Sequence, residues 1–290
     1  MNTPGRETVS VLILALLIVG FILTAGCVGL VNPTPNEVMI RGNLISVDPT
    51  YVDGAFIWKL LLDPNGYEPE MVAAVDGYLI PQNPLIELGA GIGSLSAYMN
   101  DKLTMSVNQV SVEPNPYLIP SLNLTKQNND LGVTFVQKAI GYSSNTVAIS
   151  VTSDITNNRI VRPDGVLVKS VEVEKTTVQK LAQNAGFTSN ITLVMNILGY
   201  EHAVVQYEAE FLSRNVSTVI AAVYTDGKNT PDSFAEKMKL IGFTEKKPAC
   251  CGRQRIYGDD LHQIKKGDLP HDHTVFFGDL DERIREILCL

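Results

Sequence analysis

The 290-residue chain has little cysteine and histidine, and it contains no run rich in lysine or arginine. Its cysteines are Cys27, the adjacent Cys250 and Cys251, and Cys289, and none shows the Cys-x-x-Cys spacing of a zinc site. The 23 Lys and Arg against 31 Asp and Glu give a net charge of -8. Because neutralising a phosphate backbone requires clustered cations, this composition argues against nucleic acid as the main partner.

The cysteines and histidines that are present do not assemble an obvious metal site. His271-Asp272-His273 has ligand chemistry, but side chains two apart alternate faces on a strand and no third ligand follows nearby. We therefore expect a solvated loop there, and no bound metal. Outside the cytoplasm, Cys289 could form a disulfide with Cys250 or Cys251, whereas inside all are expected as free thiols.

The N-terminal region has no charged side chain from Thr8 to Val31, and its apolar run is long enough to cross a bilayer as a helix. The run ends in Leu23-Thr24-Ala25-Gly26-Cys27, which resembles the lipoprotein signal-peptide box, with Thr24 where that box most often has leucine. Three interpretations stay open: a lipidated Cys27, an uncleaved helix and a cleaved signal. Each of the first two predicts a membrane-associated protein.

The side of the membrane is open, because Arg6 and Glu7 before the segment and Glu37 and Arg41 after it give the positive-inside rule almost nothing to count. Asn32-Pro-Thr-Pro-Asn36 reads as a linker, since proline prevents the helix from continuing. The predicted organisation is an anchor or signal at 1–31, a linker at 32–36, an N-terminal cap at 37–83 and a larger domain at 84–290.

From Pro84 onward, short β-like runs alternate with helical stretches, which is the pattern of a parallel sheet covered on both faces. The predicted strands are Leu85–Leu88, Ser106–Val112, Val133–Ala139, Thr192–Ile197, Ser217–Tyr224 and Thr274–Phe277. The predicted helices are Ser94–Asp101, Tyr117–Asn128, Thr176–Ala185, His202–Arg214 and Asp232–Ile241. A polar insertion predicts a small hairpin from Val147–Val151 and Val166–Val168.

The run from Ile86 to Gly93 reads Ile-Glu-Leu-Gly-Ala-Gly-Ile-Gly, an apolar strand end followed by alternating glycines. Such a turn at the carboxyl end of a strand lets the backbone approach a ligand closely. Ser94 occupies the position where a dinucleotide fingerprint has glycine, which disfavours NAD and a nicotinamide oxidoreductase. The residues predicted to contact a cofactor here are Gly89, Ala90, Gly91 and Gly93.

About twenty residues further on, the second strand ends in Glu113-Pro114-Asn115. A carboxylate at this rim of the sheet can accept hydrogen bonds from two ribose hydroxyls. Alternatively, Glu113 favours the N-terminus of the following helix by its charge, and both roles can coexist. The glycine loop and Glu113 together predict a nucleotide-type cofactor.

With these residues in place, the sequence resembles the S-adenosylmethionine-dependent methyltransferases, specifically the FkbM-type branch, from roughly Glu68 to Phe277. The matching segments are Glu87-Leu-Gly-Ala-Gly-Ile-Gly93, Glu113-Pro-Asn-Pro116, Lys138-Ala-Ile-Gly141, Val173-Glu-Lys-Thr-Thr177 and Asn196-Ile-Leu-Gly-Tyr-Glu201. The resemblance implies a Rossmann-like α/β fold of the class I methyltransferase type. Its sheet is mostly parallel with an antiparallel last strand, expected at Thr274–Phe277, and helices cover both faces.

The resemblance also implies roles for the matching residues. The glycine loop would hold the amino-acid end of S-adenosylmethionine and Glu113 its ribose, with Pro114 and Asn115 beside it, while Glu87 would maintain the loop. The acceptor side departs from the family, because Asn196 and Leu198 stand where aspartate and glutamate are usual, and the strand Ser217–Tyr224 has alanine where the family usually has an acid.

The candidates for acceptor chemistry that remain are Glu201 and His202. His202 could replace a missing base, although a lone histidine at the start of a helix is more often a cap or surface residue. The leading hypothesis is a membrane-tethered methyltransferase acting on a hydroxyl of a sugar, a lipid-linked glycan or another small acceptor. The alternative is a catalytically inactive lipoprotein that uses the same fold for binding or structure. The acceptor and the oligomeric state are not specified by the sequence.

Overall fold

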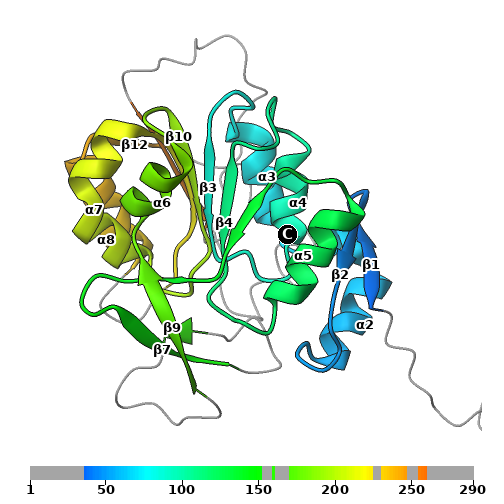
Figure 1. The fold of residues 1–290 in the computed structure, drawn as a ribbon. Helices are drawn as coiled ribbons and strands as arrows, with labels where there is room; N and C mark the ends of the chain where they lie inside the picture. Colours follow the sequence, from blue (N-terminus) through cyan, green and yellow to red (C-terminus); the bar gives the residue numbers. More distant parts are fainter. Residues whose placement is uncertain (1–35, 152–158, 161–169, 225–229, 247–253, 260–290) are drawn as a thin grey trace, which may run out of the picture. The chain divides into compact units, whose positions relative to one another are not determined.

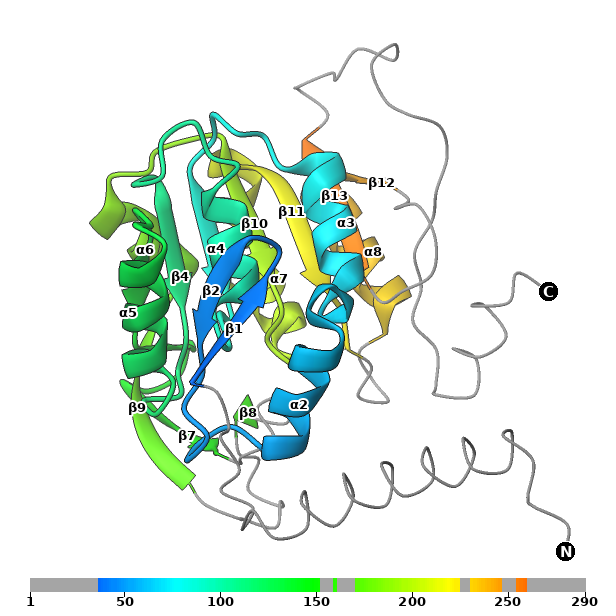
Figure 2. The ribbon, with the colours of Figure 1, turned by 90° about the vertical axis from the view of Figure 1, so that its right-hand side faces the viewer.

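The structure of this chain is a computed structural model that describes residues 36–151, 159–160, 170–224, 230–246 and 254–259 (Figures 1 and 2). The predicted anchor, Cys27, the other cysteines, the 271–273 triplet and the predicted segments 166–168 and 274–277 lie outside these residues. Within the described ranges, no helix has the length and apolar character needed to cross a bilayer. The same ranges hold no group of three His, Cys, Asp or Glu side chains placed to share a metal ion.

The core of the fold is a seven-stranded sheet in the order β12-β13-β11-β10-β3-β4-β5. Its strands are β3 (Leu85–Leu88), β4 (Gln109–Val112), β5 (Thr134–Val136), β10 (Ile191–Met195), β11 (Val216–Ala222), β12 (Phe243–Lys246) and β13 (Gln254–Asp259). Neighbouring strands from β5 to β11 pair in parallel, whereas β13 is antiparallel to both β11 and β12. The predicted Rossmann-like α/β fold, mostly parallel with one reversed strand, is confirmed.

The structure places a reversed strand earlier in the chain than the predicted one. Among the described residues, the strand that runs against β11 is β13, at Gln254–Asp259, whereas the predicted segment Thr274–Phe277 lies outside them. The segment Gln-Arg-Ile-Tyr-Gly-Asp carries only two large apolar residues, so its sequence gives a weak strand signal. Its pairing with β11 depends on tertiary structure rather than on local preference.

A smaller sheet follows the carboxyl end of β5, in the order β6-β9-β7-β8. Its strands are β6 (Ala139–Ile140), β7 (Thr146–Ser150), β8 (Arg159–Ile160) and β9 (Ser170–Thr176). The strand expected at Val133–Ala139 is therefore divided between two sheets. The strand β7 was predicted, and it pairs with β9 along its whole length.

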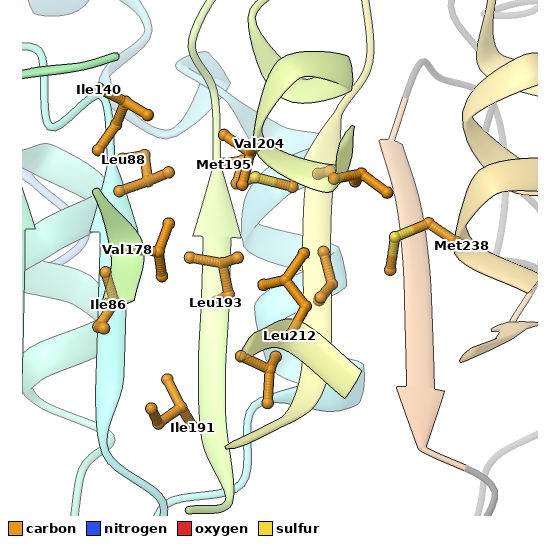
Figure 3. Packing of buried hydrophobic residues seen from close by; sticks show 14 of the residues in the cluster. Ile86, Leu88, Ile140, Val178, Ile191, Leu193, Met195, Val204, Leu212 and Met238 are labelled. Atoms are coloured by element: carbon orange, nitrogen blue, oxygen red, sulfur yellow. The ribbon is translucent and has the colours of Figure 1, made fainter. Parts of the chain in front are cut away.

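Helices cover both faces of the large sheet (Figure 1). One layer contains α6 (Val178–Ala185), α7 (Glu201–Asn215) and α8 (Pro231–Leu240), and the other contains α3 (Pro69–Tyr78), α4 (Ser94–Asn100) and α5 (Ile119–Asn128). Successive side chains of each strand point to opposite faces of the sheet and pack against different helix layers. Ile86, Leu88 and Leu193 belong to the cluster under α6–α8, while Leu85 and Val194 pack with α3 and α4. Figure 3 shows the first cluster, with Val178, Val204, Leu212 and Met238 among the helix residues that contribute to it.

The N-terminal part of the described chain adds the hairpin β1 (Glu37–Ile40) and β2 (Asn43–Ser46), the helix α2 (Gly54–Leu62) and the short 3-10 turn Pro64–Gly66. The hairpin is fixed to α5 by polar contacts. Leu44 N–H donates to Asn129 Oδ1 at 2.7 Å, and Ser46 N–H donates to Thr125 Oγ1 at 2.9 Å. The chain then turns back through Tyr67 and Glu68 into α3, which brings residue 68 to the carboxyl end of the sheet.

Glu208 ties two helices of the same layer together. It interrupts α7 with non-helical backbone angles, φ -116° and ψ 19°, and its buried carboxylate accepts from Val178 N–H at 2.8 Å and Gln179 N–H at 2.7 Å. The hydroxyl of Tyr142 donates to the same carboxylate. Glu208 therefore caps the N-terminus of α6 from the neighbouring helix.

We predict that Glu208→Ala lowers the free energy of unfolding by about 3 kcal/mol, because it leaves buried donors without their acceptor. Glu210→Ala is the matched control on the same helix, since Glu210 forms an exposed i,i+4 ion pair with Arg214. Its loss should be below about 0.5 kcal/mol. Urea unfolding followed by circular dichroism measures both, and equal losses would contradict the capping role.

Candidate functional site

The glycine loop follows β3 at the carboxyl edge of the sheet, and each of its three glycines has a positive φ: 89° at Gly89, 56° at Gly91 and 82° at Gly93. A Cβ at Gly89 would lie 2.3 Å from the backbone oxygen of Asn196, and one at Gly93 would lie 2.6 Å from Leu122 Cδ2. A Cβ at Gly91 would meet nothing within 4 Å. Packing therefore requires glycine at the two outer positions, while the backbone at Gly91 faces space that a ligand can approach.

Glu113 follows β4 and binds the glycine loop directly. Its Oε2 accepts from Gly91 N–H and its Oε1 from Asn115 N–H, both at 2.8 Å. The side chain is 6% exposed, and burial raises the pKa of this carboxyl to about 7. Neither bond reaches the first turn of α5, so the geometry favours the loop-side role over the helix-capping alternative. Each oxygen keeps a second lone pair that can accept from a ligand hydroxyl.

Asn115 lies next to this carboxylate and has an unused donor. The side chain is fully buried, and its Oδ1 accepts from Tyr117 N–H at 3.0 Å. Its Nδ2 has no acceptor among the described residues. A buried N–H₂ without a partner is costly, so this atom is suited to a ligand that supplies an acceptor. Pro114 lies between the two residues, and Ala90 is buried in the loop opposite.

Glu87 is the last acidic residue before the loop and lies within β3. It is buried and accepts a hydrogen bond from the Ser96 hydroxyl of α4 at 2.5 Å. Burial is the main cause that raises the pKa of Glu87 to about 7, while hydrogen bonds from Ser111 and Ser96 oppose the rise. This residue therefore connects the strand before the loop to the helix after it.

Asn196 follows β10, beside the glycine loop, and its amide is held on both sides. Nδ2 donates to Glu68 Oε1 at 2.8 Å, and the Tyr224 hydroxyl donates to Asn196 Oδ1 at 3.2 Å. Glu68 was not among the candidates from sequence. No motif in the sequence links Glu68 to Asn196, which is 128 residues away.

Glu201 supports the loop between β10 and α7. Its fully buried carboxylate accepts from Ile197 N–H at 3.0 Å and Gly199 N–H at 2.9 Å, around two residues with positive φ, Leu198 at 54° and Gly199 at 102°. Burial raises the pKa of Glu201 to about 7. The carboxylate is thus engaged in holding the backbone of this loop.

His202 is 3% exposed and packs edge-on against Phe234 of α8, with ring centroids 5.3 Å apart. It lies in the first turn of α7, and this ring contact joins α7 to α8. The role of Glu201 and His202 in acceptor chemistry stays a prediction from sequence.

The site is strongly acidic. Glu68, Glu87, Glu113 and Glu201 each have a pKa raised to about 7, with burial as the largest cause. The charge of Glu87 further raises the pKa of Glu68, and the charge of Glu113 further raises the pKa of Glu87. The salt bridges of the described chain join other residues, Lys102 to Asp76, Lys138 to Glu174 and Arg214 to Glu210. Such a site favours a cationic ligand over an anionic one.

Comparison with known proteins gives only structural similarities, since no family model and no curated protein matches the sequence. The precorrin-6y C5,15-methyltransferase of Geobacter metallireducens is 8% identical, with 67% of this chain and 88% of that chain covered and a TM-score of 0.40. Fibrillarin of Aeropyrum pernix, solved with bound S-adenosylmethionine, is 10% identical over 65% and 73%, with a TM-score of 0.38. An rRNA methylase of Streptococcus thermophilus is 11% identical over 66% and 92%, with a TM-score of 0.38.

Proposed function

We propose that this chain binds S-adenosylmethionine at the Gly89–Gly93 loop and transfers its methyl group to a hydroxyl of a sugar or another small acceptor, tethered to a membrane by its N-terminal segment. The observation that supports cofactor binding is the hydrogen bond from Gly91 N–H to Glu113 Oε2, at 2.8 Å, within a group of buried carboxylates. Bound at this loop, the cofactor supplies an electrophilic methyl group on a positively charged sulfur.

The residues present fit this cofactor. Gly91 leaves open space above the loop, Glu113 retains lone pairs for the ribose hydroxyls, and the buried Asn115 Nδ2 offers a donor that the described residues do not use. S-adenosylmethionine carries an ammonium and a sulfonium, which the carboxylates around the loop would attract. The pyrophosphate of a dinucleotide would instead be repelled, and the Gly91 N–H that it would need is already bonded to Glu113.

The acceptor part of the proposal rests on the family resemblance and on one feature of the structure. Tyr200 follows the loop that begins at Asn196, and Tyr142 stacks on Tyr200 with centroids 6.2 Å apart and on the exposed Tyr207 at 4.7 Å. Aromatic faces beside a cofactor site suit the apolar face of a sugar ring or another small ring. The membrane tether rests on the sequence of residues 8–31 alone.

Calorimetric titration of the full chain in mild detergent tests the cofactor. We expect saturable binding of S-adenosylmethionine and no binding of NAD at the same millimolar concentration. A folded protein that gives no heat with S-adenosylmethionine, or that binds NAD more tightly, would contradict the proposal.

A second candidate is a non-catalytic module that keeps the fold. Asn196 and Leu198 provide no base, Glu201 holds backbone N–H groups, and His202 is buried, which together favour this reading. A topology reporter fused to the C-terminus separates the two. A cytoplasmic C-terminus exposes the domain to S-adenosylmethionine and favours the enzyme, whereas an external one favours the non-catalytic alternative.

A further inference from the structure

Glu68 has an unusual backbone for its position. It is the N-cap residue of α3 with φ 48° and ψ 45°, the left-handed region that costs a non-glycine residue about 1 kcal/mol or more. An N-cap side chain ordinarily accepts from the first turn of its own helix, but that of Glu68 makes no such bond. The carboxylate is directed away from α3, toward the carboxyl end of β10.

Its partner there is Asn196, and the two residues are chemically matched. Asn196 Nδ2 donates to Glu68 Oε1 at 2.8 Å, and Tyr224 fixes the other side of the same amide. The aspartate usual at this position in the family could not donate, and it would place two carboxylates in contact. The asparagine therefore accommodates a carboxylate that comes from a different segment of the chain.

Among the four carboxylates around the loop, Glu68 differs in how accessible its oxygens are to a ligand. Glu113 and Glu201 each hold two backbone N–H groups, and Glu87 is sealed within β3. Glu68 is half-buried, and its second oxygen has no hydrogen-bond donor in the described part of the chain. The charge of Arg41 lowers the pKa of Glu68, but the Arg41 guanidinium donates its hydrogen bonds to the backbone oxygens of residues 65 and 67.

We infer that Glu68, held by Asn196, is the counter-ion for the ammonium group of S-adenosylmethionine, so that the segment before the sheet completes the cofactor site. This inference rests on the proposed function. The alternative role, a base that removes the acceptor proton, fits the site less well. A cation bound nearby favours the ionised carboxylate, which makes it a weaker base.

The test compares ligands that separate the ammonium group from the sulfonium group. Full-length protein in mild detergent is titrated with S-adenosylmethionine, which has both groups, with S-adenosylhomocysteine, which has the ammonium but no sulfonium, and with 5′-deoxy-5′-methylthioadenosine, which has neither. The variants are Glu68→Gln, Glu68→Asp, and the control Glu70→Gln, which removes the same charge from the same helix. Thermal unfolding followed by circular dichroism verifies that each variant is folded.

We expect Glu68→Gln to weaken binding of S-adenosylmethionine and of S-adenosylhomocysteine about 10- to 100-fold, and that of methylthioadenosine less than about twofold. Glu68→Asp, which keeps the charge, should recover part of the loss, and Glu70→Gln should change the binding of no ligand by more than about twofold. Equal weakening of all three ligands by Glu68→Gln would show a structural role and overturn the inference. No weakening of any ligand, or weakening of S-adenosylmethionine alone, would also overturn it. Failure of the unmutated protein to bind S-adenosylmethionine would instead refute the proposed function itself.

Discussion

Gly89→Ala should lower the free energy of unfolding by about 3 to 5 kcal/mol, because two costs coincide at this residue. The backbone has φ 89°, and the added methyl would lie 2.3 Å from the backbone oxygen of Asn196. Neither partner can move cheaply. Asn196 N–H donates to Leu88 O at 2.9 Å, and Gly89 N–H donates to Val112 O at 2.9 Å, so both are extensions of the parallel sheet.

Gly91→Ala is the matched comparison within the same loop. Its φ of 56° is accessible to alanine at a cost of about 1 kcal/mol, and the methyl would meet nothing within 4 Å. The protein should therefore fold, but the methyl would occupy the space that the proposed cofactor approaches, and binding of S-adenosylmethionine should weaken at least about tenfold. Urea unfolding and calorimetric titration of both variants test this. Equal destabilisation, or unchanged binding by Gly91→Ala, would contradict the assignment of the loop.

The strands that lie inside the sheet were the most predictable elements. The strand at Leu85–Leu88 was predicted with its observed bounds, and all of its residues are buried. A parallel strand covered on both faces reads as a short apolar run, and glycine marks its end. The helices behind these strands were placed to within a few residues of their observed ends for the same reason, since their apolar spacing reflects the sheet they cover.

The edges of the fold were less predictable, because long-range pairing determines them. In β9, Ser-Val-Glu-Val-Glu-Lys-Thr alternates as a strand should, yet no strand is predicted there. Its partner β7 is separated from it by a long insertion. The reversed strand β13 has few apolar residues, and β11 and β12 determine its position.

The cofactor side of the site could be predicted from the spacing of residues along the sequence, but the position of Glu68 in the site could not. The distance in sequence from the glycine loop to Glu113 is fixed by one helix and one strand, so the meeting of Gly91 and Glu113 could be anticipated. Glu68 and Asn196 are 128 residues apart and belong to no shared motif. Only the path of the chain through the hairpin, α2 and the turn at Tyr67 brings these two residues together.

The acidity of the site leads to a prediction about pH and stability. Glu68, Glu87, Glu113 and Glu201 have pKa values of about 7 in the folded chain, against an ordinary value of 4.5. A carboxyl whose pKa is raised by folding binds its proton more tightly in the folded state. Its contribution to stability is complete below about pH 4.5 and is lost as the pH rises through 7. The free energy of unfolding without ligand should therefore fall between about pH 5 and pH 8.

Binding of a cation should lower the carboxyl pKa values that folding raises. A positive charge beside these carboxylates favours their ionised form and lowers their pKa values, so binding of S-adenosylmethionine near pH 6 should release protons. Its affinity should rise with pH up to about 7, by as much as tenfold per pH unit for each proton released. Titrations at pH 6 in buffers with different ionisation enthalpies count the protons, with methylthioadenosine as the uncharged control. Proton uptake, or equal release with both ligands, would show that these carboxylates do not serve a cationic cofactor.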